Sequence, residues 1–357
     1  MNMLARYSLL LFTLFVSGFS LGFAPAIADE LPEDTNKIES LTPEQAQKLA
    51  REFPGMKVDI EVKGAGVLSK FGLPLSGLKS LDAETAKELA GYGKALLVLN
   101  GLTKLDAETA KALAGFNGKY LPLIGLTTLD AATARGLAEF KGDVLYLNGL
   151  TTLDAATAKA LTEFKGRDLS LNGLATLDAD TAKALAGFGG QHLSLKGMTA
   201  IDADTAKALA DFKGYFLDLD GLTALDADTA KALGEFKGEV YLHNNAAKAF
   251  FAKNPLTPET ALAWAALVKG DLFYVTTLDS PDAVAVAQAL AKRKGPLNLP
   301  NLKKISPKTL TALLEKEDVE IPLIETLELI QEPDGSATED FVVPEGFQER
   351  QQQRRRP

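Results

Sequence analysis

The chain has 357 residues, and 46% of them are hydrophobic, which is enough to build an extended core. The absence of cysteine excludes disulfide bonds, thiol catalysis and a lipid-anchoring cysteine. A formal net charge of −9 without a basic stripe argues against nucleic acid or an anionic membrane as a partner.

Residues 1–28 have the three parts of an export signal peptide. Arg6 supplies the positive start, residues 9–23 the apolar stretch, and residues 26–28 a small-x-small cleavage site. An uncleaved membrane anchor is the alternative, but cleavage is favoured because the apolar stretch is interrupted by Ser17, Gly18, Ser20 and Gly22. No other segment is apolar enough to span a bilayer. We therefore expect an exported protein (periplasmic, at the cell surface or secreted) with no membrane span after cleavage.

The next residues are expected to form a flexible leader (29–39) and an N-terminal capping repeat (40–72). The capping repeat is indicated by LTPEQAQKLAREF at 41–53, in which Thr42 is placed to cap a helix and Pro43 to occupy its first turn.

Residues 73–240 contain seven copies of a 24-residue repeat, the period range of solenoid proteins. Each copy opens with L-x-L, which predicts a short strand with both leucines on one side. A glycine follows in every copy, where it indicates either a positive φ or a close approach to the next coil. These glycines are Gly77, Gly101, Gly125, Gly149, Gly173, Gly197 and Gly221.

The second half of each repeat predicts a short capped helix. An aspartate stands directly before the helix-favouring run A-x-T-A-K-A-L-A and is expected to accept hydrogen bonds from its first turn. Ala110, Leu113 and Phe116 lie three residues apart and predict one buried stripe. A later glycine, as at Gly118, Gly142 and Gly166, is expected to end the helix. The aspartates are Asp82, Asp106, Asp130, Asp154, Asp178, Asp202 and Asp226.

Together these patterns predict an α/β repeat solenoid with one short parallel strand and one short helix per 24-residue repeat. The pattern L-x-L-x-G-L-T-x-L-D followed by a helix resembles exported bacterial leucine-rich-repeat proteins. It departs from their common frame at the asparagine position, where Leu102 and its equivalents stand. The resemblance implies a binding scaffold rather than a particular activity.

Beyond the array, residues 241–330 are expected to form degenerate repeats and a C-terminal cap. The helical half recurs three times with proline after the capping residue, and LNLPNLKKIS at 297–306 restores the strand and corner. Residues 331–357 are low in core residues and are expected to be a disordered tail. Arg354, Arg355 and Arg356 could dock on an acidic surface, although a solvated tail is favoured.

Strand positions facing away from the core are the natural place for function, because the recurring residues are needed by the fold. One group of such positions combines aromatic and charged side chains, as binding surfaces do. We therefore expect a partner-binding surface made of Tyr120, Tyr146, Asp168, His192, Phe216, Asp218 and Asp220.

Other chemistry is less well supported. Asp168 and His192 could be a catalytic pair, but no serine or cysteine nucleophile has a recognisable setting. The run FLDLDG at residues 216–221 resembles a calcium loop but lacks its acids, since Phe216 and Ala227 occupy two of the places where acids are needed. Exposed threonine columns are explained by turn hydrogen bonding rather than ice binding.

We therefore expect a non-enzymatic, exported scaffold for a protein or glycan partner, with no cofactor and no metal. The alternative is a structural or assembly protein of the cell envelope.

Overall fold

The computed structural model describes residues 31–62, 66–242, 250, 256–268, 272–273, 275–293, 295–332, 343 and 346–349. The chain divides into two units, Met1–Leu31 and Pro32–Pro357, and the account below concerns the second. The expected signal peptide lies outside the described residues. Most of the expected tail also does, and two of its described residues, Glu332 and Phe347, are buried.

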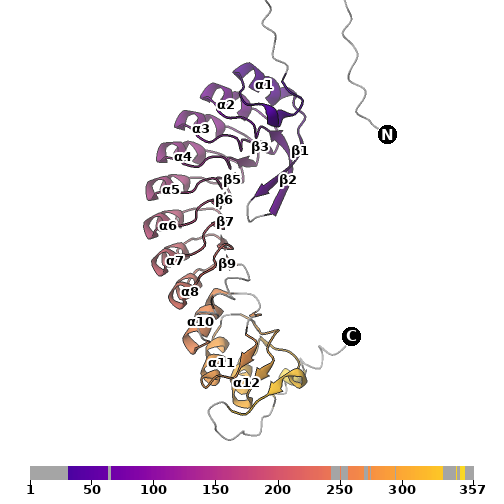
Figure 1. Ribbon diagram of the computed structural model, residues 1–357, viewed down its shortest axis with the longest axis vertical. Helices are drawn as coiled ribbons and strands as arrows, with labels where there is room; N and C mark the ends of the chain where they lie inside the picture. The colour runs from indigo at the N-terminus through magenta and orange to yellow at the C-terminus, as the bar shows by residue number, and fades with distance from the viewer. Residues whose placement is uncertain are drawn as a thin grey trace, which may run out of the picture. The chain divides into compact units, whose positions relative to one another are not determined.

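The protein is an α/β repeat solenoid, as its sequence predicts (Figure 1). Nine strands form one sheet in chain order, and all neighbours from β2 onward are parallel. The strands are β1 (Met56–Val62), β2 (Gly66–Pro74), β3 (Leu96–Val98), β4 (Tyr120–Pro122), β5 (Val144–Tyr146), β6 (Asp168–Ser170), β7 (His192–Ser194), β8 (Phe216–Asp218) and β9 (Glu239–Tyr241). The helices that alternate with them are α1 (Pro43–Glu52), α2 (Ala83–Ala90), α3 (Ala107–Leu113), α4 (Ala131–Ala138), α5 (Ala155–Leu161), α6 (Ala179–Leu185), α7 (Ala203–Ala210) and α8 (Ala227–Gly234).

The seven repeat aspartates begin the helices α2 to α8, as expected. In each case the aspartate Oδ1 accepts a hydrogen bond from the threonine amide three residues later, at 2.6–2.8 Å. At Asp130 the bond from the Thr133 amide lowers the carboxyl pKa below its ordinary value of 3.8. The aspartates are therefore used to stabilise helix starts.

The predicted helix stripe forms a core that is continuous between coils. Ala110, Leu113 and Phe116 are fully buried. The phenylalanine of each coil lies over that of the next, with ring centroids 6.0–6.2 Å apart and interplanar angles of 3–15°. The column consists of Phe116, Phe140, Phe164, Phe188, Phe212 and Phe236.

The glycine after each strand is needed for close approach and not for a positive φ. Within the described residues, only Gly55 and Gly295 have positive φ. A Cβ atom on Gly149 would lie 2.0 Å from the carbonyl oxygen of Ile124 in the preceding coil. No side chain fits there without moving the backbone.

The later glycines do not end the helices, contrary to expectation. Helix α4 ends at Ala138, while Gly142 lies beyond the buried Phe140. A Cβ on Gly142 would meet the Phe140 ring at 2.2 Å and the Gly118 carbonyl oxygen at 2.6 Å. The sequence expectation for Gly118, Gly142 and Gly166 is therefore wrong: these residues make room for the phenylalanine column.

The N-terminal end differs from the expected leader and simple capping repeat. Residues Thr35–Lys37 form a 3-10 helix, and the Thr35 hydroxyl donates to the carbonyl of Pro74 at the end of β2. After α1, strands β1 and β2 pair as an antiparallel hairpin that was not expected. The ordered coil thus begins before residue 40, and the hairpin extends the sheet by one antiparallel strand.

The seventh interval of the array has 23 residues instead of 24. Strand β9 pairs with β8 so that Phe216 faces Glu239, Leu217 faces Val240 and Asp218 faces Tyr241. One residue is missing between Gly238 and the strand, compared with the preceding coil. Val240 therefore follows the inward leucines, not the outward Phe216 column to which a strict 24-residue spacing assigns it.

Beyond residue 256 the strand–helix alternation continues less regularly, as expected for degenerate repeats. Helix α8 contacts α10, and α10, α11 and α12 contact one another in sequence. Strands β10, β12 and β14 form one parallel sheet, and β11 and β13 another. The elements are α10 (Pro258–Leu267), β10 (Thr277–Leu278), α11 (Ala283–Ala291), β11 (Leu297–Asn298), β12 (Lys304–Ile305), α12 (Pro307–Leu314), β13 (Val319–Glu320), a 3-10 helix (Ile324–Thr326) and β14 (Glu328–Leu329).

The buried Glu332 carboxylate supports the start of α12. It accepts hydrogen bonds from the Ser306 hydroxyl and the Lys308 amide, both at 2.9 Å. A residue of the expected tail thus belongs to the folded end of the solenoid.

Candidate functional site

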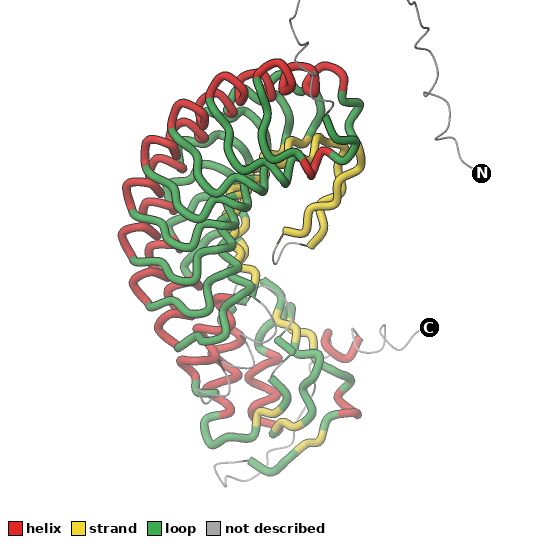
Figure 2. Tube along the Cα trace, turned by 45° about the horizontal axis from the view of Figure 1, so that its top comes forward, coloured by secondary structure: helices red, strands yellow, loops and turns green. Residues whose placement is uncertain are grey.

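The sheet lines the inner side of the curved array, and the helices line its outer side (Figure 2). We call the surface formed by the outward strand residues the inner face. Three columns make it up. Along the strands β3 to β9 these are Leu96, Tyr120, Val144, Asp168, His192, Phe216 and Glu239; then Val98, Pro122, Tyr146, Ser170, Ser194, Asp218 and Tyr241; then, after the strands, Asn100, Ile124, Asn148, Asn172, Lys196 and Asp220.

The inner face is less exposed than the alternation of the strands predicts. Val98, Val144, Ser170, Ser194 and Asp218 are buried although they point away from the leucine core. Two features account for part of this burial: a hydrophobic cluster near the hairpin and a chain of polar contacts further along.

The hairpin contributes to the inner face at its N-terminal end. Val58 of β1 joins the cluster that Leu96 and Val98 form with Tyr120, Ile124 and Tyr146. Lys70 of β2 places its Nζ 5.7 Å from the centre of the Tyr120 ring, a cation–π contact. Tyr120 and Tyr146, both expected in the binding surface, therefore serve intramolecular packing.

Burial also changes the acidity of Tyr146. Desolvation, with a smaller effect of the Asp168 charge, raises the pKa of its phenol to about 12. Tyr146 therefore remains neutral at physiological pH and belongs to the packed part of the inner face.

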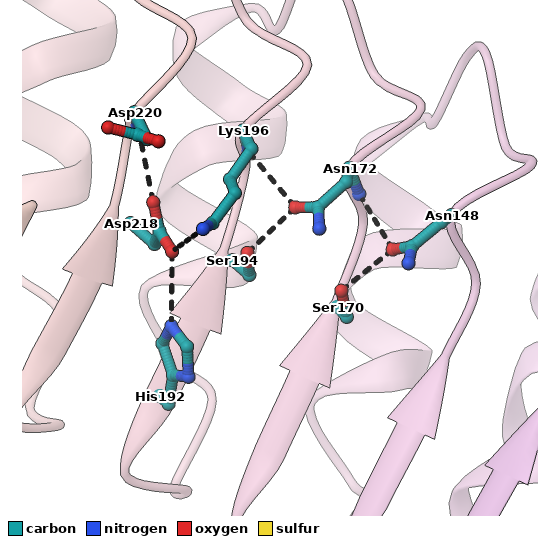
Figure 3. A network of polar contacts seen from close by, with 8 residues as sticks. All are labelled: Asn148, Ser170, Asn172, His192, Ser194, Lys196, Asp218 and Asp220. Atoms are coloured by element: carbon teal, nitrogen blue, oxygen red, sulfur yellow. Dashed lines mark hydrogen bonds and ion pairs between the residues drawn. The ribbon is translucent and has the colours of Figure 1, made fainter. Parts of the chain in front are cut away.

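A ladder of asparagine and serine side chains follows the cluster (Figure 3). Asn148 Oδ1 accepts a hydrogen bond from the Ser170 hydroxyl at 2.7 Å and another from the backbone N–H of Asn172 at 3.0 Å. Asn172 Oδ1 accepts in the same way from the Ser194 hydroxyl and the Lys196 amide. This buried asparagine column was missed because the familiar repeat frame places asparagine elsewhere. Its signal was the recurring L-N-G after the strand.

The next rung of the ladder is charged instead of neutral (Figure 3). Lys196 takes the asparagine place and Asp218 the serine place. Lys196 Nζ lies 3.1 Å from Asp218 Oδ2, and Asp218 Oδ1 accepts from the Asp220 amide at 3.2 Å. Asp218 is only 4% exposed. We expected it to face solvent in the binding surface, but it is buried and links Lys196 to Asp220.

His192 does not form the pair with Asp168 that its neighbouring strand position suggests. Its Nε2 lies 3.7 Å from Asp218 Oδ2, whereas Asp168 is bound by the Arg167 guanidinium at 3.2 Å. Asp168 is thus paired with Arg167, and the acid near His192 is Asp218. The Asp168–His192 catalytic pair considered from the sequence is not formed.

The end of the inner face at β8 and β9 is open and aromatic. The Phe216 ring meets the His192 ring edge-on at 6.3 Å and stacks with the Tyr241 ring at 5.4 Å. Tyr241 is 43% exposed, and Glu239 beside Phe216 is also exposed. Partial burial, then the charges of Glu239 and Asp218, raise the pKa of Tyr241.

We call Phe216, Tyr241, Asp220 and Glu239 the open patch. Phe216 and Asp220 were expected in the binding surface. Tyr241 and Glu239 were missed because the 23-residue interval shifts them into the outward columns.

In the part of the chain that the structure describes, no three histidine, aspartate or glutamate side chains are grouped to hold a metal ion. Among the described residues, no helix has the length and apolar character needed to cross a bilayer.

A scan against models of protein families finds no match, and a search of curated protein sequences finds none either.

Proposed function

We propose that this protein is an exported scaffold that binds a protein or glycan partner on the inner face of its sheet. The observation that carries the proposal is the stacked Phe216–Tyr241 pair, which ends the array with an exposed ring where the other inner-face side chains are mostly buried or paired. Exposed aromatic residues beside isolated charges are typical of binding surfaces.

Binding is favoured over catalysis by the use of the polar groups. Asp218, the acid nearest to His192, is already bound by Lys196 and by the Asp220 amide. Export is supported by the signal pattern in residues 1–28.

The test is capture from a cell-envelope extract with the mature chain as bait. A triple variant, His192→Ala, Phe216→Ala and Tyr241→Ala, should lose the captured partner while retaining the circular dichroism of the parent. The control removes three exposed lysines of the outer helices, Lys111, Lys159 and Lys207, and should retain it.

Equal capture by both variants would contradict the proposal. If the bait captures nothing but assembles with itself, the alternative of a structural or assembly protein is supported instead.

A further inference from the structure

We propose that the open patch binds a cationic side chain, preferably an arginine, of a protein partner. This inference rests on the proposed function and decides between the two partner classes left open there. It follows from the charges, the rings and their arrangement.

The open patch carries an excess of negative charge. Lys196 lies nearest to Asp218, at 3.1 Å, so the charge of that buried acid is balanced locally. Asp220 and Glu239 form no ion pair among the described residues. A cation of a partner would therefore gain from two carboxylates, whereas an anionic partner would be repelled.

The rings and the two acids of the open patch belong to neighbouring positions of the sheet. In the register of β8 and β9, Glu239 stands beside Phe216, and Tyr241 stands beside Asp218, two residues before Asp220. A guanidinium group that stacks on an exposed ring can also form hydrogen bonds to a carboxylate with its edge. Arginine fits this combination better than lysine because its charge is planar and forked.

The same sheet already contains an intramolecular version of this contact. Lys70 of the hairpin places its ammonium 5.7 Å from the Tyr120 ring at the other end of the inner face. The open patch offers the same type of ring surface, with carboxylates added and with Tyr241 exposed.

A neutral glycan would use only part of this surface. Its C–H groups could lie on the rings, but two carboxylates with surplus charge would add little selectivity for an uncharged ligand. The charge therefore favours a basic polypeptide.

The probe is the peptide fluorescein-(Gly-Arg)4-amide, labelled at its N-terminus, titrated with the full chain and followed by anisotropy at low salt. The same peptide with citrulline in place of arginine removes the charge and keeps the shape. We expect the arginine peptide to bind at least about tenfold more tightly than the citrulline peptide.

The decisive variant is Asp220→Asn with Glu239→Gln, which removes two charges from the open patch. It should weaken arginine-peptide binding about tenfold. The matched control, Asp180→Asn with Asp204→Asn, removes two exposed charges at the starts of α6 and α7 and should leave binding unchanged. Equal weakening by both variants, or equal binding of the citrulline peptide, would overturn the inference.

The neutral tetrasaccharide chitotetraose separates this failure from failure of the proposed function. If it binds, and Phe216→Ala with Tyr241→Ala abolishes its binding, the inner face is a binding surface but the cationic partner is wrong. If the envelope partner is captured equally by all inner-face variants, the proposed function itself is wrong.

Discussion

The charged rung of the inner-face ladder predicts a specific double exchange. Replacing Lys196 by Asn and Asp218 by Ser would recreate the neutral rung that Asn148–Ser170 and Asn172–Ser194 form in the two preceding coils. If the ladder is a repeated structural device, the two substitutions together should be far milder than they are singly.

The burial of the two groups sets the expected magnitudes. Lys196→Asn leaves the Asp218 carboxylate, whose side chain is 6% exposed, without its cation, and should lower the free energy of unfolding by about 3 kcal/mol. Asp218→Ser leaves an ammonium whose side chain is 16% exposed and can reach water, so the cost should be about 1 kcal/mol. The double variant should lie within about 1 kcal/mol of the parent, a coupling of about 3 kcal/mol.

Equilibrium unfolding in urea at pH 7, followed by far-ultraviolet circular dichroism, measures all four chains of this cycle. Costs that simply add, to about 4 kcal/mol in the double variant, would refute the equivalence of the charged and neutral rungs.

Three further predictions follow from the repeat contacts. Gly149→Ala should lower the free energy of unfolding by at least about 2 kcal/mol, because its Cβ would clash with the backbone of the preceding coil. Gly189→Ala is the control: its Cβ would have no atom within 4 Å, so the same urea assay should show no change. Asp130→Ala should cost about 1 kcal/mol. Because the cap lowers the Asp130 carboxyl pKa, its contribution is present above about pH 4 and lost as pH falls through the folded pKa. When the pH is lowered, the free energy of unfolding should fall less for Asp130→Asn than for the parent. An equal fall in both chains would contradict the role of Asp130 as a helix cap. Glu332→Ala should lower the free energy of unfolding by about 2 kcal/mol, and no change would exclude the role assigned at α12.

Periodicity predicted those parts of the fold in which each residue has the same neighbours in every coil. The L-x-L strands, the aspartate caps and the stripe ending at Phe116 follow from local rules that the stacking then reinforces. The glycine after each strand was also placed correctly, and the structure selects close approach from the two reasons considered.

Features that depend on contacts between coils were harder to predict. The first strand of the hairpin, Met56–Val62, alternates apolar and charged residues, but the second, Gly66–Pro74, does not, so the sequence indicates only half of the hairpin. Burial of Asp218 could not be inferred from the alternation of the strand, because it depends on contacts of its carboxylate with the Lys196 ammonium and the Asp220 backbone amide.

The same limit applies to the candidate site. Phe216 and Asp220 were found from column membership alone. Tyr241 and Glu239 required the actual strand register, since one missing residue moves every later side chain by one position.

The central claim is that successive coils share one continuous apolar interior, and Phe164 tests it most directly. Its ring is fully buried and stacks on Phe140 and Phe188 at 6.0 and 6.1 Å. Amide hydrogen exchange should be measured on Phe164→Ala, a change that removes about 3–5 kcal/mol of core packing. A shared interior predicts faster exchange in α4, α5 and α6 together. Faster exchange confined to α5, with its neighbours as protected as in the parent, would show separately folded units and contradict the account.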